Sequence, residues 1–119
     1  MAKDAPRFNA QVFLDSAGLA KEIVEYVRDD VIYSQGDPCD SVMYIQKGSV
    51  KLSVLSKNGR EAIVAMLGPK DFFGEGCLAG QLVRIGAATA MTPSTILIVG
   101  KDQMMSVLHT QRVVTRLGG

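Results

Sequence analysis

The sequence holds 119 residues, with thirteen Lys and Arg against twelve Asp and Glu and a formal net charge of +1. A chain of this length can bury one hydrophobic core, so we expect a single domain over residues 1–119. The balanced charge argues against a surface that binds nucleic acid by itself. No apolar run approaches the roughly 20 residues of a membrane span, and the N-terminus lacks the apolar stretch of a signal peptide. We therefore expect a cytoplasmic protein without membrane contact.

The first predicted element is a short helix within FLDSAGLAKEIVEYVRDD, residues 13–30. Asp15 or Ser16 can cap its N-terminus. Its apolar side chains recur at helical spacing, namely at Leu19, Ile23, Val24 and Val27.

After this segment the pattern changes to short apolar runs separated by turn residues. Gly36, Gly48 and Gly59 stand between these runs, where a left-handed backbone costs glycine least, and we interpret them as sharp corners of a compact roll. The dipeptide Asn58-Gly59 predicts a hairpin with a type I′ turn, in which both central residues have positive φ.

The last third of the chain continues with two strands around the turn Thr92-Pro93-Ser94. Helical spacing returns in KDQMMSVLHTQRVVTRL, residues 101–117. Many short strands with helices only at the two ends predict a mainly β fold, a double-stranded β-helix or jelly-roll barrel with flanking N- and C-terminal helices.

One segment, DFFGEGCLAGQLVRIGAATA (residues 71–90), places an acid and a base among small and apolar residues. Glu75 lies between two glycines, and a glycine-rich turn of this kind can direct several backbone N–H groups at an anion. Arg84, nine positions later, can add a charge-assisted hydrogen bond to a phosphate oxygen. An internal ion pair between Glu75 and Arg84 explains the same spacing, and the residues alone leave both interpretations open.

These motifs together resemble the cyclic-nucleotide-binding domain of Crp/Fnr-type bacterial transcription regulators, over about residues 13–108. VIYSQGDPCDSVMYIQKGSVKLSV is similar to the paired strands of that family, and GPKDFFGEGCLAG to its phosphate-binding cassette. TPSTILIV resembles its closing hairpin. The resemblance implies a β-roll that senses a small anionic ligand.

Site roles follow from the resemblance. It implies that the Gly74 N–H binds the cyclic phosphate, that Glu75 accepts from the ribose 2′-hydroxyl, and that Arg84 binds a phosphate oxygen. Gly76 and Cys77 belong to the same cassette, and Gly76 stands where the family commonly has Leu. Ile85 stands where the family has Ala, Ser or Thr, so its side chain offers no hydrogen bond to phosphate or guanine, although its backbone N–H remains.

The cysteine and histidine content of the sequence gives little support for a cofactor. We expect Cys39 and Cys77 to be free thiols, and no Cys precedes Cys39 to hold the iron–sulfur cluster of Fnr-like members. His109 is the single histidine, which argues against haem, against the metal of a cupin-type enzyme, and against any metal site. We expect no enzyme activity, no cofactor and a ligand such as cyclic AMP or another cyclic nucleotide.

The resemblance implies a regulatory domain that acts when its ligand repositions the cassette and the C-terminal helix. DNA would be contacted only through a helix-turn-helix domain that this chain lacks, and the chain can form a homodimer. Two alternatives stay open: a regulatory domain of a kinase, channel or other non-transcriptional protein, and a degenerate module that binds no ligand and only dimerises.

Overall fold

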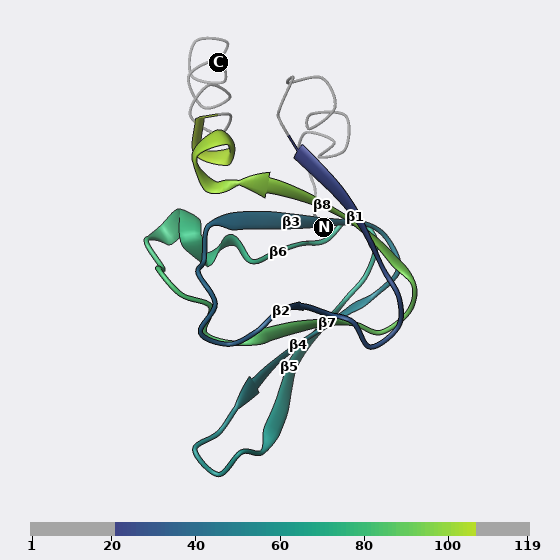
Figure 1. The fold of residues 1–119 in the computed structure, drawn as a ribbon, viewed down its shortest axis with the longest axis vertical. Coiled ribbons are helices and arrows are strands. Elements are labelled where there is room, and N and C mark those ends of the chain that lie inside the picture. The colour runs from purple at the N-terminus through teal and green to yellow at the C-terminus, as the bar shows by residue number, and fades with distance from the viewer. Residues whose placement is uncertain (1–20, 107–119) are drawn as a thin grey trace, which may run out of the picture.

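The computed structural model of the chain describes residues 21–106, and two four-stranded antiparallel sheets make up most of this part (Figure 1). One sheet has the strand order β1-β8-β3-β6 and the other β2-β7-β4-β5. The strands are β1 (Lys21–Tyr26), β2 (Val31–Tyr33), β3 (Ser41–Lys47), β4 (Val50–Leu55), β5 (Glu61–Leu67), β6 (Phe72–Phe73), β7 (Ala87–Ala90) and β8 (Ser94–Gly100). A 3-10 helix, η1 (Glu75–Ala79), follows β6, and residues 101–106 are helical. The predicted mainly β double-sheet roll is confirmed.

The main core lies between the two sheets, where strands of both contribute buried side chains. Its buried members are Met43, Ile45, Val50, Phe73, Ala88 and Ile96. A second cluster lies on the opposite face of the β1-β8-β3-β6 sheet, beneath η1 and the helical residues 101–106. Its buried members are Cys39, Val42, Tyr44, Cys77, Leu97, Val99 and Met104. Because alternate residues of β3 point to opposite faces, this strand serves both clusters and has four consecutive buried residues.

The predicted N-terminal helix is wrong for its second half, because residues 21–26 form strand β1. β1 pairs antiparallel with β8 along its whole length, from Lys21 opposite Val99 to Tyr26 opposite Ser94. Two of the apolar residues that suggested helical spacing, Ile23 and Val24, lie next to each other in β1, and such β-branched residues suit a sheet. Backbone hydrogen bonding to β8 favours the strand over the helix in this segment.

The predicted hairpin at Asn58-Gly59 is confirmed as a connection between β4 and β5, but its turn type is wrong. Only Gly59 of the pair has a positive φ, at 79°. The Gly59 N–H donates to the Ser56 carbonyl over 2.9 Å, and the Ser56 N–H donates to the Arg60 carbonyl over 2.9 Å. This pattern is a three-residue loop that ends in a left-handed glycine. The Ser56 hydroxyl favours it by accepting from the backbone N–H groups of Asn58 and Arg60.

The two strands predicted around the turn Thr92-Pro93-Ser94 are present as β7 and β8, but they do not pair with each other, and TPSTILIV, which resembles a closing hairpin, holds β8 alone. β7 lies between β2 and β4, whereas β8 lies between β1 and β3 in the other sheet. The chain changes sheets at this turn, and it also changes sheets between β3 and β4, at Gly48 and Ser49. The two crossings are bound together, because the Met91 N–H donates to the Ser49 carbonyl over 2.8 Å and the Ser49 N–H to the Thr92 hydroxyl over 3.1 Å.

Several predictions fall outside the described residues. They concern residues 13–20 of the N-terminal helix, residues 107–117 of the C-terminal helix, and His109. Within residues 21–106, no helix is long and apolar enough to cross a membrane. Figure 1 also shows β4 and β5 running together as a ribbon beyond the two layers.

The sheet crossing at Gly48 generates a stability prediction. Gly48 has φ of +95°, and a Cβ there would lie 2.6 Å from the Pro93 carbonyl oxygen and 2.7 Å from Ser94 Cα. We expect Gly48→Ala to lower the free energy of unfolding by more than about 3 kcal/mol, because backbone strain and a backbone clash add. Gly59→Ala is the matched control, since its φ is +79° with open space around the new Cβ, and it should cost only about 1–2 kcal/mol. Urea unfolding that gives equal losses would contradict the predicted clash.

Candidate functional site

The Arg84 backbone is held between η1 and β7 by the loop before β3. The Arg84 N–H donates to the Asp37 carbonyl over 2.7 Å, and its carbonyl accepts from the Gly36 N–H over 2.8 Å. Pro38 and Val83 form an isolated antiparallel bridge beside this pair. Gly36 makes the corner with φ of +94°, as predicted from its place between strands. The position of Arg84 therefore depends on a loop almost fifty residues earlier in the chain.

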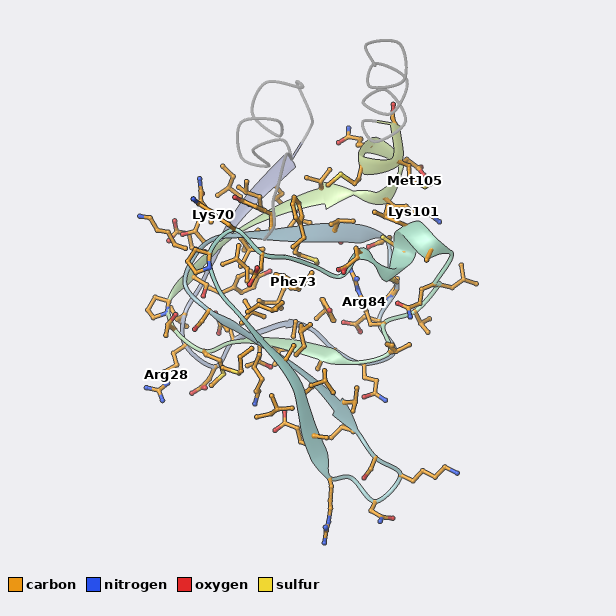
Figure 2. All side chains as sticks on the ribbon, turned by 180° about the vertical axis from the view of Figure 1, so that it is seen from behind. Arg28, Lys70, Phe73, Arg84, Lys101 and Met105 are labelled. Carbon is orange, nitrogen blue, oxygen red and sulfur yellow. The ribbon has the colours of Figure 1, made fainter. Side chains whose placement is uncertain are left out.

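The guanidinium of Arg84 is buried, with only 4% of the residue exposed. Its Nη1 donates to the Gly74 carbonyl over 2.7 Å and to Cys39 Sγ over 3.2 Å. Its Nη2 donates to the Ser41 carbonyl over 2.9 Å. The Tyr33 ring packs on its flat face, with Arg84 Cζ 4.2 Å from the ring centroid. Figure 2 shows Arg84 beside η1, at the end of the roll away from Arg28.

Among the described residues, the buried Arg84 guanidinium has neither an anionic partner nor a complete set of hydrogen bonds. In the described part of the chain, every acceptor of Arg84 is neutral. Its Nε–H is buried without a hydrogen-bond partner. Burial of a charge is costly unless an opposite charge and a full set of hydrogen bonds compensate for lost water. An anion beside this guanidinium would supply the missing opposite charge, and the predicted alternative, an internal ion pair between Glu75 and Arg84, is not formed.

The cassette is shaped by glycine. Gly74 has φ of 77° and ψ of 15° and precedes η1, and Gly80 has φ of 94° and follows it. A Cβ on Gly74 would lie 2.8 Å from Arg84 Nη1 and 3.0 Å from Met43 Sδ, so both the backbone and the space require glycine. The Gly74 carbonyl can approach the guanidinium closely for this reason.

The remaining predicted site residues differ in exposure. Glu75 is exposed, and it lies close enough to Tyr33 for its charge to affect the pKa of that phenol. Cys77 is fully buried and directs its thiol to the Ser41 carbonyl over 3.6 Å, so its side chain is a packing group under η1. Ile85 is 67% exposed, and its side chain therefore does not fill the space beside the guanidinium.

Gly76, where the family commonly has Leu, is covered by the side chain of Gln81. A Cβ on Gly76 would meet Gln81 Oε1, and this oxygen also lies 3.9 Å from Cys39 Sγ. Gln81 thus occupies the space that a larger residue would take. The small size of Gly86 likewise has a packing reason, because a Cβ there would lie 2.5 Å from the Ser53 carbonyl oxygen of β4.

Sequence reasoning missed four groups that contact the guanidinium: Tyr33, Cys39, Ser41 and Met43. Ser41 acts mainly through its backbone carbonyl, which leaves no trace in the side-chain pattern. In the sequence, Tyr33 resembles any other aromatic residue of a predicted strand. These groups meet Arg84 only because the fold brings β2 and the start of β3 next to residues 74–84.

Comparison with known proteins places the chain in a family. The family model described as "Cyclic nucleotide-binding domain" matches residues 23–111. The chain is 29% identical over 92 residues to the CRP-like cAMP-activated global transcriptional regulator of Mycobacterium tuberculosis, covering 76% of this chain and 41% of that protein. It is 35% identical over 97 residues to the global nitrogen regulator of Synechococcus elongatus, covering 80% of this chain and 44% of that protein.

A solved structure from a third organism has a similar fold. The catabolite activator protein of Thermus thermophilus superposes with a TM-score of 0.76 at 22% identity, over 91% of this chain and 49% of that one. The chain thus spans less than half the length of the curated relatives named above.

The Tyr33 ring generates a prediction about the unliganded protein. We expect Tyr33→Leu to lower the free energy of unfolding by about 1 kcal/mol more than Tyr33→Phe, because the phenyl ring keeps its face on the buried guanidinium and the leucine does not. Urea unfolding of the two variants measures the difference. Equal stabilities would mean that the ring contributes packing area alone.

The second prediction concerns alkaline pH. Burial raises the pKa of Cys77 from its usual 9.0, neighbouring Cys39 raises it further, and Arg84 lowers it to a lesser degree. A thiol with a raised pKa in the folded state holds its proton longer than in the unfolded chain, so it stabilises the fold below pH 9 and this stabilisation is lost as the pH rises through the folded value.

We therefore expect the free energy of unfolding to fall as the pH rises above about 9, and less steeply in Cys77→Ala. Burial also raises the pKa of Tyr33, from 10.0, so part of the decline at the upper end should remain in the variant. Identical slopes for wild type and variant would contradict the assignment.

Proposed function

Because the chain belongs to the family of cyclic nucleotide-binding domains, we propose that it is the ligand-sensing domain of a Crp/Fnr-type transcription regulator and binds a cyclic nucleotide. The buried guanidinium without an anionic partner is the observation that carries the proposal. A cyclic phosphodiester is a compact anion, and it would supply the missing charge. Both named relatives are global regulators, one of them a transcriptional regulator, which supports regulation rather than catalysis.

The proposed contacts follow the cassette. Arg84 binds a phosphate oxygen, the Gly74 N–H donates to another, and the exposed carboxylate of Glu75 accepts from the ribose hydroxyl. Gly76 and Cys77 line the cassette through their backbone. Ile85 contributes its backbone N–H and an apolar surface, because it has no hydroxyl for the base or the phosphate.

Ligand binding in this proposal changes the partners of Arg84. The guanidinium donates to the neutral carbonyl of Gly74 in the cassette and to Cys39 in the loop before β3. A phosphate oxygen carries charge and is the stronger acceptor, so it displaces a neutral one. The cassette carbonyl released in this way must find another donor, which favours a different position of η1.

The same contacts lead to the C-terminal helix. Cys39 and Ser41, which both accept from Arg84, flank Asp40, and the Asp40 carbonyl accepts from the Lys101 N–H over 2.9 Å. Met104 of the helical residues 101–106 is buried in one cluster with Cys77 of η1. A ligand that prefers one arrangement of η1 therefore shifts the population of helix positions. In the full-length regulator this shift would reorient a helix-turn-helix domain, which binds DNA, within a homodimer.

The test is a binding measurement with cyclic AMP. We expect Arg84→Met to weaken cyclic AMP binding at least about 100-fold, because the charge-assisted hydrogen bonds to phosphate are lost. Methionine fills similar volume without a charge, so the fold should persist. Arg28→Met is the matched control, since Arg28 is exposed and lies at the other end of the roll (Figure 2), and it should bind like wild type.

Titration calorimetry gives the affinities, and thermal shift against cyclic AMP, cyclic GMP and 2-oxoacids identifies the ligand class. Unchanged affinity in Arg84→Met would overturn the assigned phosphate contact. No stabilisation of the wild type by any cyclic nucleotide would favour a domain that binds none.

A further inference from the structure

The two cysteines of the sequence, Cys39 and Cys77, converge beneath the cassette. Cys39 lies in the loop before β3 and Cys77 in η1, yet both are buried free thiols in the same core cluster. Arg84 donates to Cys39 Sγ over 3.2 Å and to the Ser41 carbonyl over 2.9 Å. The Cys77 thiol donates to that same carbonyl over 3.6 Å. Both sulfur atoms therefore lie around one guanidinium.

The two thiols have unequal chemistry. The Arg84 guanidinium contacts the Cys39 sulfur directly, and reactive cysteines are typically found beside a cation. Cys39 also keeps 5% of its surface exposed, whereas Cys77 has none. Burial is the first cause that raises the pKa of Cys77, and the second is Cys39 itself, so the two thiols lie close enough to interact. Cys39 thus suits the attacking role, and Cys77 suits that of a resolving thiol.

We propose that Cys39 and Cys77 form an oxidative modification site, at which a peroxide converts the two thiols into a disulfide. The Cys39 thiolate attacks one peroxide oxygen, the O–O bond breaks, and hydroxide leaves as Cys39 becomes a sulfenic acid. The Cys77 thiol then loses its proton as its sulfur attacks the Cys39 sulfur, the S–O bond breaks, and the leaving hydroxide takes up that proton and departs as water. Two thiols and one hydrogen peroxide give one disulfide and two waters, so the sulfur atoms are oxidised and the peroxide is reduced.

This disulfide would join η1 covalently to the loop before β3. That loop accepts from Arg84 and, through the Asp40 carbonyl, from the start of the helical residues 101–106. The cassette then cannot leave its unliganded position without carrying the loop with it. Resting on the proposed function, we infer that oxidation lowers the affinity for a cyclic nucleotide by about fivefold or more, a typical coupling between two sites.

The first experiment tests the disulfide without any ligand. The full chain is reduced, exposed to hydrogen peroxide and examined by intact mass, thiol titration in denaturant and non-reducing electrophoresis. We expect a monomer that has lost two hydrogen atoms and both titratable thiols and that returns to the starting mass with dithiothreitol. Two free thiols after treatment, or only disulfide-linked dimers, would overturn the proposal.

Single variants test the assigned order. In Cys77→Ala, Cys39 should form a sulfenic acid that dimedone traps, whereas in Cys39→Ala the buried Cys77 should react far more slowly. Faster labelling of Cys77 than of Cys39 would reverse the two roles and contradict the part given to Arg84. The wild-type mass and thiol count need no variant, so the disulfide remains testable if a variant fails to fold.

The second experiment compares reduced and oxidised protein by calorimetry with cyclic AMP. Weaker binding by the oxidised protein that dithiothreitol reverses supports the coupling, and equal binding by both forms refutes it. Absence of binding to the reduced protein would contradict the proposed function, while the thiol measurements would still decide whether the modification site exists.

Discussion

A buried arginine without an opposite charge is the constraint on which this structure depends. Arg84 is almost fully enclosed, its described acceptors are neutral, and its Nε–H has no partner. Such a group is only partly stabilised, because neutral carbonyls and an aromatic face do not fully compensate for the hydration that the charge has lost. The unliganded domain therefore stores an unmet preference for an anion. A ligand that meets this preference gains binding energy that a surface arginine, already hydrated, would not provide.

The fold makes this burial possible by bringing three segments together. The loop before β3 holds the Arg84 backbone through Asp37 and Gly36, the start of β3 supplies Ser41, and the turn before η1 supplies the Gly74 carbonyl. Each segment is itself fixed by sheet pairing or by a left-handed glycine. Displacement of one hydrogen bond at the guanidinium therefore affects cassette and loop at once, as a sensor requires.

The jelly roll and its corners were predictable because they depend on local chemistry. Short apolar runs separated by Gly36, Gly48 and Gly59 indicate strands and turns wherever the partners lie. The predictions that were wrong concern features that depend on partners distant in the sequence. Residues 21–26 form a strand because β8 offers a complementary edge, and the turn at Asn58-Gly59 takes its type from the Ser56 hydroxyl. The segment that contains β7 and β8 resembles a hairpin in sequence, but the chain changes sheets between the two strands.

The residues of the candidate site also divide into those that the sequence predicted and those that it did not. Glu75 and Arg84 were visible in the sequence because an acid and a base among glycines are unusual there, and the family resemblance gave them roles. Tyr33 and the Ser41 carbonyl were not visible, since an aromatic residue in a strand and a backbone oxygen have no distinctive pattern. Nor does composition reveal that Gln81 covers Gly76.

Exposure of Ile85 beside a buried Arg84 separates two questions that the family pattern combines. Capture of the phosphate depends on charge and enclosure, which Arg84 has. In the proposed function, choice of the base depends on hydrogen bonds beside the guanidinium, where the exposed Ile85 offers only apolar surface. Loss of a hydroxyl there removes a contact that could distinguish ligands, but it leaves the unmet charge of the guanidinium intact. If the domain binds a cyclic nucleotide as proposed, it therefore keeps its affinity for the cyclic phosphate, while its selectivity among bases differs from that of family members with Ser or Thr at this position.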